Sequence, residues 1–202
     1  MEPSLELWIG TTNKGKLSEF KLLLEKGLPD FQIKTLQDLP SYTQPPENGK
    51  TFLENARIKA KSLKAMRQNV WSFAEDSGLE VEELGGLPGI HSARYAGPHA
   101  RDSENLAKLL KMMQIKGCPT RKARFLCTMV AFDPLGNEHI LYGELPGSIA
   151  KAPLGQMGFG YDPVFVPETQ TKTLAELGPG FKSLSSHRAK ATLQLIELIK
   201  SK

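Results

Sequence analysis

The sequence has few of the residues that stabilise small secreted proteins or build membrane spans. Only two cysteines are present, Cys118 and Cys127, and they form no CxxC pair. A disulfide framework or a cysteine zinc site is therefore not expected, particularly since the four histidines are scattered. The longest apolar run, residues 125–132, contains Thr128 and is much shorter than the roughly 20 residues of a transmembrane helix.

Residues 1–4 show no basic region leading into an apolar core. We therefore predict no signal peptide and a cytoplasmic protein. The 202 residues are 40% hydrophobic and 24% charged, which is typical of a globular domain. A chain of this length buries roughly 70% of its unfolded surface, so it needs no disulfide or metal to hold a core. The length predicts one domain, or one domain with a lobe, over residues 1–202. The net charge of +4 suits polyanions, from a triphosphate to RNA, without choosing among them.

Apolar runs typical of strands alternate with runs of helical periodicity, which predicts an α/β fold. Strands are expected at residues 5–9, 31–36, 70–74, 79–82, 124–132, 138–144 and 163–166. Helices are expected at residues 17–26, 51–67, 102–113 and 186–200, with a helical turn at 173–177. Thr51 and Glu54 have the spacing of a capping box at the start of the second helix. The buried face of that helix is expected to contain Phe52, Ala56, Leu63 and Met66.

Residues 10–16 form a polar turn between the first strand and the first helix. The N–H groups of a helix N-terminus, together with Gly15 and Lys16, are suited to binding phosphate. The spacing approaches that of a P-loop, but Leu17 stands where a P-loop has its Mg²⁺-binding hydroxyl. An ordinary strand–helix turn with solvated lysines is an equally good interpretation.

Carboxylates occur in two segments. Glu75 and Asp76 follow an expected strand, and Glu47 lies in a Pro-rich loop. Three such groups could bind Mg²⁺ and orient or deprotonate water. Neighbouring side chains on a strand point to opposite faces, so Glu75 and Asp76 can share one site only if a turn begins between them. The alternatives are a helix-capping Asp and a solvated glutamate.

The helix after Glu47 is rich in lysine and arginine. Such a face is usually solvated, although one inward-facing member could neutralise phosphate charge. The basic residues are Arg57, Lys59, Lys61, Lys64 and Arg67.

Two further segments could bind a flat ligand. Phe159 or Tyr161 could stack on a base and Asp162 could contact its edge, with glycines allowing close approach. Lys182 and residues 185–188 place donors near the start of the last helix, where they would favour a keto oxygen or a phosphate. A tight turn with a core aromatic and a hydroxyl helix cap are the structural alternatives.

In combination, these segments resemble the inosine/xanthosine triphosphate pyrophosphatase family, which hydrolyses non-standard purine nucleotides. The matching motifs occur in the family's order and cover nearly the whole chain. They are residues 11–16 (TTNKGK), 51–56 (TFLENA) with Lys59 and Ala60, 76–79 (DSGL), 84–95 (LGGLPGIHSARY), 158–163 (GFGYDP) and 186–188 (SHR).

The resemblance implies an elongated mixed central sheet with flanking helices, forming two lobes around an active-site cleft. It also implies a homodimer and Mg²⁺-dependent hydrolysis of ITP, dITP, XTP or dXTP to the monophosphate and pyrophosphate. No nucleic acid or membrane partner is expected.

The resemblance also assigns roles to individual residues. The triphosphate would be bound by Thr11, Thr12, Asn13, Lys14, Gly15 and Lys16, with Lys59 facing the phosphates and Ser77 contacting the substrate. Glu47 and Asp76 would hold Mg²⁺, and Asp76 would accept the proton of the attacking water. Phe159 would stack on the base, beside Gly160, Tyr161 and Asp162, while Lys182, His187 and Arg188 would contact the purine edge. Many family members have Asp where this chain has Glu75, so Glu75 is either a third metal ligand or a neighbour of the site.

Three other functions remain open at this level. The same chemistry could act on another modified purine nucleotide. Residues 10–16 could belong to a P-loop-like phosphotransferase, against which Leu17 argues. The basic helix could serve a non-catalytic RNA-binding module, although aromatic residues make up only 7% of the chain and no RNP-like motif is present.

Overall fold

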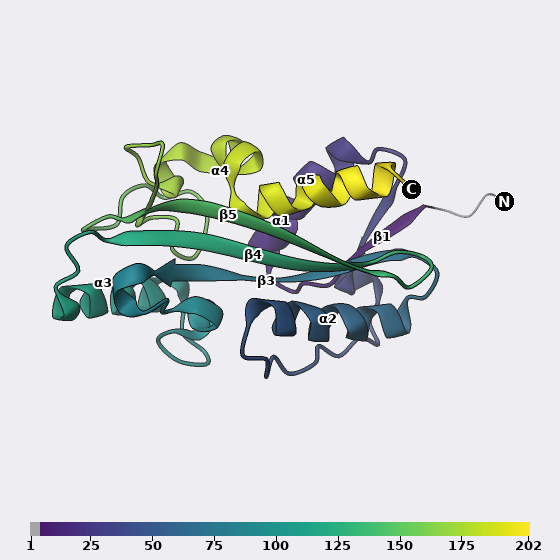
Figure 1. The fold of residues 1–202 in the computed structure, drawn as a ribbon, viewed down its shortest axis with the longest axis horizontal. Helices are drawn as coiled ribbons and strands as arrows, with labels where there is room; N and C mark the ends of the chain where they lie inside the picture. The colour runs from purple at the N-terminus through teal and green to yellow at the C-terminus, as the bar shows by residue number, and fades with distance from the viewer. Residues whose placement is uncertain (1–4) are drawn as a thin grey trace. The chain divides into compact units, whose positions relative to one another are not determined.

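Six strands form one mixed sheet in the computed structural model, which describes residues 5–202 (Figure 1). The strand order is β2-β1-β3-β4-β5-β6. β1 pairs in parallel with β2 and β3, whereas β5 and β6 are antiparallel. The strands are β1 (Glu6–Ile9), β2 (Gln32–Thr35), β3 (Trp71–Val81), β4 (Lys122–Phe132), β5 (Glu138–Ile149) and β6 (Phe165–Pro167). The predicted mixed α/β fold is confirmed.

Five α-helices flank these strands in the described residues. They are α1 (Lys14–Gly27), α2 (Phe52–Met66), α3 (Asp102–Lys116), α4 (Leu174–Ser185) and α5 (His187–Lys200). Within residues 5–202 no helix is long and apolar enough to cross a membrane. The prediction of no signal peptide rests on residues 1–4, which lie outside the described residues.

The chain forms two compact units. Unit 1 extends to Asp76 and continues over Cys127–Gly143 and Arg188–Lys202, and unit 2 comprises Ser77–Leu126 and Glu144–His187. The chain therefore passes from one unit to the other within β3, β4 and β5.

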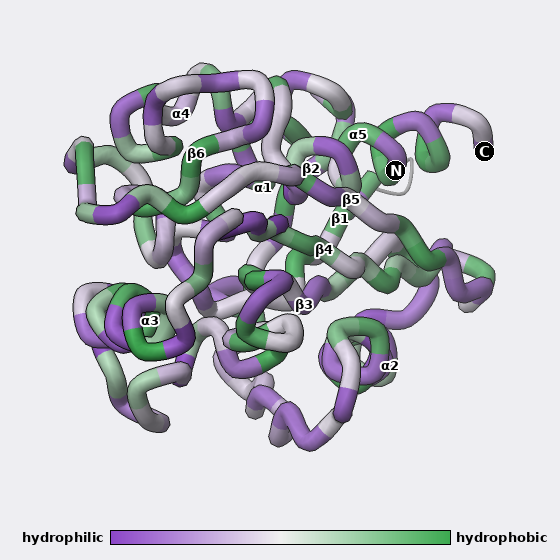
Figure 2. The backbone as a smooth tube through the Cα atoms, turned by 60° about the vertical axis from the view of Figure 1, so that its left-hand side comes forward, coloured by the Kyte–Doolittle hydropathy of each residue, from purple (hydrophilic) through white to green (hydrophobic). Residues whose placement is uncertain are grey.

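In unit 1 the strands are covered on both faces. Phe20 of α1 and Leu195 of α5 pack with Phe73 in one apolar cluster. On the other face, Ala60 of α2 packs against Ala74 in a second cluster. Successive residues of β3 thus face helices on opposite sides, as expected of a strand, in which neighbouring side chains point to opposite faces. Figure 1 shows α5 and α2 on opposite sides of β3, and Figure 2 shows α2 with hydrophobic and hydrophilic stretches alternating around its turns.

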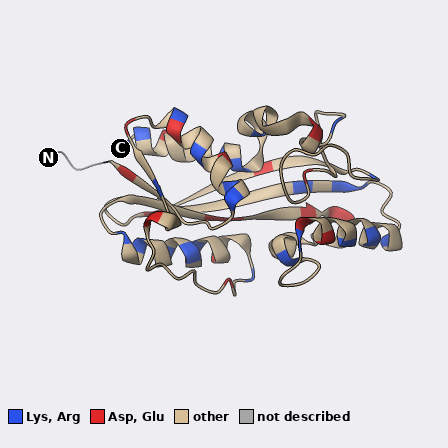
Figure 3. Ribbon diagram, turned by 180° about the vertical axis from the view of Figure 1, so that it is seen from behind, with Lys and Arg blue, Asp and Glu red and all other residues tan. Residues whose placement is uncertain are grey.

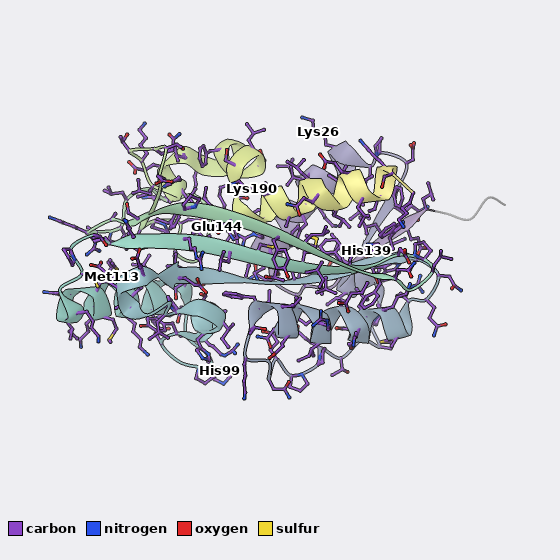
Figure 4. All side chains as sticks on the ribbon, in the orientation of Figure 1. Lys26, His99, Met113, His139, Glu144 and Lys190 are labelled. Atoms are coloured by element: carbon purple, nitrogen blue, oxygen red, sulfur yellow. The ribbon has the colours of Figure 1, made fainter. Side chains whose placement is uncertain are left out.

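The hairpin predicted between residues 132 and 138 is confirmed and is held by polar contacts. Asp133 accepts hydrogen bonds from the N–H and the side-chain amide of Asn137, at 2.8 and 2.9 Å. His139, labelled in Figure 4, lies 3.2 Å from Asp133 through Nε2. Pairing with these donors lowers the pKa of Asp133 to about 2, although burial alone would raise it.

Unit 2 has a single apolar cluster between its helices and strands. Met113 of α3 (labelled in Figure 4), Phe165 of β6 and Leu174 of α4 are members of it. α4 has a kink at Gly178, where φ is +76°, a conformation that glycine adopts without a steric penalty. The helical turn predicted at residues 173–177 is the part of α4 before this kink, and a second helical stretch follows up to Ser185.

Two local predictions were wrong. The strand expected to end before Glu75 continues to Val81 as one strand of 11 residues, because both acidic residues find cationic partners, as described below. Met66 is 42% exposed at the last turn of α2, while Asn55 and Lys59 take the buried positions instead.

Candidate active site

The polar turn after β1 is fixed at both ends. The Gly10 N–H donates to the Phe73 carbonyl at 2.8 Å. A Cβ at Gly10 would lie only 3.0 Å from the Cβ of Ala74, so glycine permits this close approach. At the other end, the Asn13 side chain caps α1 by accepting a hydrogen bond from the Lys16 N–H at 3.0 Å. The positive end of the helix dipole lies at this turn, which suits a phosphate ligand.

Lys16 connects the turn to the centre of β3. Its Nζ lies 2.9 Å from Oε1 of Glu75, a carboxylate that is only 1% exposed. The other oxygen, Oε2, lies 3.8 Å from Sγ of Cys127. Burial raises the pKa of the Cys127 thiol, which keeps its proton available for donation. Burial acts to raise the pKa of Glu75 as well, but Lys16, Lys59 and Arg188 outweigh it and lower the pKa to about 2.

A second charged cluster lies on the opposite face of β3, where α2 packs. Lys59 Nζ lies 3.1 Å from Oε1 of Glu47 and 3.5 Å from Oδ1 of Asp76. Lys59 is 6% exposed, whereas Lys61 on the same helix is exposed. Figure 3 marks the positions of the lysine and arginine residues along α2 in blue. Of these basic residues, Lys59 is the one that faces inward, as expected of a residue that neutralises phosphate.

The pKa directions in this cluster suit proton transfer. Burial lowers the pKa of Lys59, but Glu75, Asp76 and Glu47 together raise it, so the side chain stays protonated. Burial raises the pKa of Asp76, opposed by Lys59 and Lys16. A carboxylate with a raised pKa is a better proton acceptor than an ordinary aspartate.

Two neutral side chains donate hydrogen bonds to the carboxylates, and sequence reasoning missed both. Gln44 accepts a hydrogen bond from Thr12 Oγ1 and donates one to Oε1 of Glu47, each at 3.1 Å. Asn55 Nδ2 donates to Oδ2 of Asp76 at 3.1 Å. Gln44 lies in a loop without a local signal. Asn55 precedes Lys59 by four residues, and this helical spacing was an available clue.

The two carboxylates of the α2 face fit a magnesium ion. Glu47 and Asp76 approach the same ammonium group, so their oxygens converge where a cation is favoured. Mg²⁺ is usually bound by one or two carboxylates together with phosphates and water. Within residues 5–202, no group of three or more His, Cys, Asp or Glu side chains could hold a metal ion. Glu75 is not brought together with the other two carboxylates, since neighbouring residues of a strand face opposite sides.

The residues predicted to bind a base lie in unit 2, Arg188 excepted. Asp162 accepts hydrogen bonds from Lys182 Nζ at 2.6 Å and from the Phe159 N–H at 2.9 Å. Lys182 Nζ also lies 4.6 Å from the centre of the half-buried Phe159 ring. The His187 ring stacks on Phe125, with centroids 4.8 Å apart. These contacts hold an aromatic ring, an ammonium and an imidazole in fixed positions.

Three other residues that were predicted to contact the substrate lie in different surroundings. Tyr161 is 5% exposed and its hydroxyl donates to the Ser92 carbonyl at 2.9 Å, so it supports the loop from inside. The Gly160 N–H donates to Asp102 at 2.7 Å. Ser77, half-buried, is the residue of β3 that follows Asp76.

Arg188 belongs to unit 1. Its Nε donates to Oε2 of Glu19 on α1 at 2.5 Å, and the residue is 5% exposed. Burial lowers the pKa of Arg188, but Glu19, Glu75 and Cys127 together raise it. The structure thus gives this guanidinium a carboxylate partner within unit 1, and its predicted contact with a purine stays a prediction.

Comparison with known proteins identifies the family. The model of the Ham1 family matches residues 7–198. The chain belongs to the Ham1 family. It is 57% identical to a dITP/XTP pyrophosphatase of Bdellovibrio bacteriovorus over 98% of each chain, and 43% identical to one of Geobacillus kaustophilus over 95% of this chain and 93% of the relative.

Solved structures of Ham1 proteins have the same fold. A HAM1 protein from Coxiella burnetii has a TM-score of 0.86 and 33% identity, covering 98% of this chain and all of its own. A nucleoside-triphosphatase / dITP/XTP pyrophosphatase from Mycobacterium abscessus has a TM-score of 0.74 and 37% identity over 96% of this chain and all of its own. The resemblance inferred from the sequence motifs is therefore confirmed, and this Ham1 chain matches its relatives over nearly its full length.

Proposed function

We propose that this chain hydrolyses non-standard purine nucleoside triphosphates, such as dITP and XTP, to the monophosphate and pyrophosphate. The observation that carries the proposal is that Glu47 and Asp76 both contact Lys59. Glu75, the neighbour of Asp76 on β3, contacts Lys16. These groups suit a metal–triphosphate ligand. The relatives named dITP/XTP pyrophosphatase supply the substrate class.

The proposed reaction is attack of water on the α-phosphorus, with pyrophosphate as the leaving group. Asp76 accepts a proton from the water, and the new P–O bond forms as the bond to the pyrophosphate oxygen breaks. Lys16 and Lys59 stabilise the negative charge on the phosphate oxygens. Glu47 and Asp76 would hold Mg²⁺, which when bound polarises phosphate oxygens and water.

In the proposal, residues of the loop before β6 and of α4 and α5 recognise the base. Phe159 stacks on the purine, and Lys182 and His187 donate hydrogen bonds to the 6-keto oxygen. Adenine has an amino group at that position, so donors would face a donor when ATP is bound. Unpaired buried polar groups of this kind can discriminate by about 10⁴–10⁵-fold.

The preferred base is tested by comparing nucleotides. Another modified purine nucleotide remains the alternative substrate, because the motifs specify the chemistry better than the base.

Mg²⁺ dependence, the homodimer and the cytoplasmic location stay predictions. We find no observation that favours a phosphotransferase or an RNA-binding module.

The test is release of phosphate from ITP, XTP, ATP and GTP in the presence of Mg²⁺, with and without added inorganic pyrophosphatase. We expect phosphate only with the helper enzyme, and mainly from ITP and XTP. Phosphate released without the helper would indicate cleavage of the γ-phosphate and would refute the proposal. Equal rates from all four nucleotides would refute the base selectivity alone.

A further inference from the structure

Asn55 donates a hydrogen bond to one of the two carboxylates that the proposed function assigns to the metal, and it contacts the loop that carries the other. It is fully buried, at 0% exposure, one helical turn before Lys59 on the same face of α2. Its Nδ2 donates to Oδ2 of Asp76 at 3.1 Å, and its Oδ1 accepts from the Gly49 N–H at 2.9 Å. Gly49 is two residues after Glu47, so one amide contacts Asp76 and the loop that carries Glu47.

The two partners of Asn55 fix the orientation of its amide. A main-chain N–H needs an acceptor and a carboxylate needs a donor, so the oxygen faces Gly49 and the nitrogen faces Asp76. The reverse orientation would place two donors together on one side and two acceptors together on the other. Because both partners require the same orientation, the amide has one favourable position.

The loop approaches Asn55 so closely that residue 49 has to be small. A Cβ at Gly49 would lie 2.7 Å from Oδ1 of Asn55 and 2.7 Å from the Cβ of Glu54. The Lys50 N–H donates to Oε2 of Glu54 at 2.6 Å. The loop is therefore attached to the first turn of α2 by two successive N–H groups.

We propose that Asn55 is a positioning residue that sets the geometry of Asp76 relative to the Glu47 loop. Its hydrogen bond to Oδ2 leaves Oδ1 as the oxygen that lies 3.5 Å from Lys59 Nζ, the ammonium group that Glu47 also contacts. This inference rests on the proposed function. Both polar atoms of the Asn55 amide already contact protein groups, Asp76 and the Gly49 N–H, so Asn55 acts through the carboxylates.

The chain offers a matched control in Asn105 of α3. Asn105 is 2% exposed, accepts from the Ala96 N–H at 2.7 Å and donates to the Ala93 carbonyl at 3.1 Å. It is a buried asparagine with one donor and one acceptor partner, like Asn55, but both of its partners are main-chain groups. Asn105→Ala therefore reports the cost in stability of losing a buried amide.

The experiment compares Asn55→Ala with Asn105→Ala in two assays. The first is the binding of Mn²⁺ alone, followed by electron paramagnetic resonance without nucleotide. The second is steady-state hydrolysis of dITP at saturating Mg²⁺. Losing a partner that orients a metal-binding carboxylate typically costs about 10–100-fold in metal affinity or activity. We expect such a loss in Mn²⁺ affinity and in kcat for Asn55→Ala, with KM within about threefold of the parent.

The thermal midpoint of each variant separates positioning from stability. Asn55→Ala and Asn105→Ala should unfold at similar temperatures, while only the former loses Mn²⁺ affinity. If both variants bind Mn²⁺ within about threefold of each other, the proposal is wrong. Should Asn55→Ala fail to fold, Asn55→Ser keeps a hydroxyl that is too short to bridge both partners, and the same result is expected.

Failure of this inference can be distinguished from failure of the proposed function. If the parent protein releases no pyrophosphate from any nucleotide, the proposed function is wrong. The Mn²⁺ titration of the variants still decides whether Asn55 orients the carboxylates. If the parent is active and Asn55→Ala keeps its kcat, only the inference on Asn55 is overturned.

Discussion

The buried charge of Glu75 should contribute measurably to the stability of the protein. Its cationic neighbours lower its pKa from 4.5 to about 2. A pKa difference of about one between the folded and unfolded states corresponds to about 1.4 kcal/mol, so ionised Glu75 stabilises the folded state by roughly 3 kcal/mol at pH 7. Because the pKa is lowered, this stabilisation is complete above pH 4.5 and is lost as the pH falls towards 2. About 1.5 kcal/mol should remain at pH 3.

Glu75→Gln keeps the shape of the side chain and removes the charge. We expect the free energy of unfolding to fall by roughly 3 kcal/mol at pH 7, and the difference from the parent to shrink by about half at pH 3. Urea denaturation at the two pH values measures both quantities. Groups that titrate alike in the two proteins cancel in the difference.

A matched control is Glu138→Gln, which removes the partner of Arg57. This carboxylate is 27% exposed, so the loss should be within about 1 kcal/mol. The reasoning on Glu75 would be refuted if Glu75→Gln cost no more than Glu138→Gln at pH 7. A gap between parent and Glu75→Gln that stayed constant from pH 7 to pH 3 would refute it as well.

Three further predictions concern turnover and selectivity. Asp76→Asn should lower kcat by about 10²–10⁴-fold, because the proton acceptor is lost. Binding of ITP, measured by calorimetry, should largely survive. A near-normal kcat would mean that another group accepts the proton. Phe159→Ala should raise the Kd for ITP about tenfold or more through lost stacking, and an unchanged Kd would exclude the ring from the base site. Arg188→Ala should reduce the ratio of kcat/KM for ITP to that for ATP. An unchanged ratio would show that Arg188 does not select the base and that its role is the pairing with Glu19.

Local signals predicted most of the helices and strands. Thr51 was expected to begin a helix, and its side chain accepts a hydrogen bond from the Glu54 N–H. Glu54 does not complete the capping box, since it accepts from Lys50 instead. The spacing of apolar residues was sufficient to predict α1 and the β4–β5 hairpin, because both form through contacts between residues close in sequence.

The interruption expected in β3 shows where local reasoning failed. Two adjacent acidic residues followed closely by a glycine are typical of a turn, yet the strand continues through them. Glu75 is matched by Lys16 on one face and Asp76 by Lys59 on the other. These partners are distant in sequence, so no local pattern predicts that acidic residues can be buried there.

Sequence reasoning named the charged residues of the candidate site but missed two neutral ones that hold its carboxylates. The sequence indicated that one basic residue of α2 could face inward, and Lys59 does so, in contact with Glu47 and Asp76. Its expected place beside the phosphates stays a prediction. Gln44 and Asn55 carry no charge and no reactive group, and their importance lies in the partners they connect. The pairing of Arg188 with Glu19 likewise joins opposite ends of the chain and leaves no signal in the sequence.

Hydrolysis of ITP in water enriched with ¹⁸O tests the central claim most directly. The account predicts that water attacks the α-phosphorus, so mass spectrometry should find the label in the nucleoside monophosphate and none in the pyrophosphate. Label in the pyrophosphate would place the attack on the β-phosphorus and contradict the mechanism built on Asp76 and Glu47.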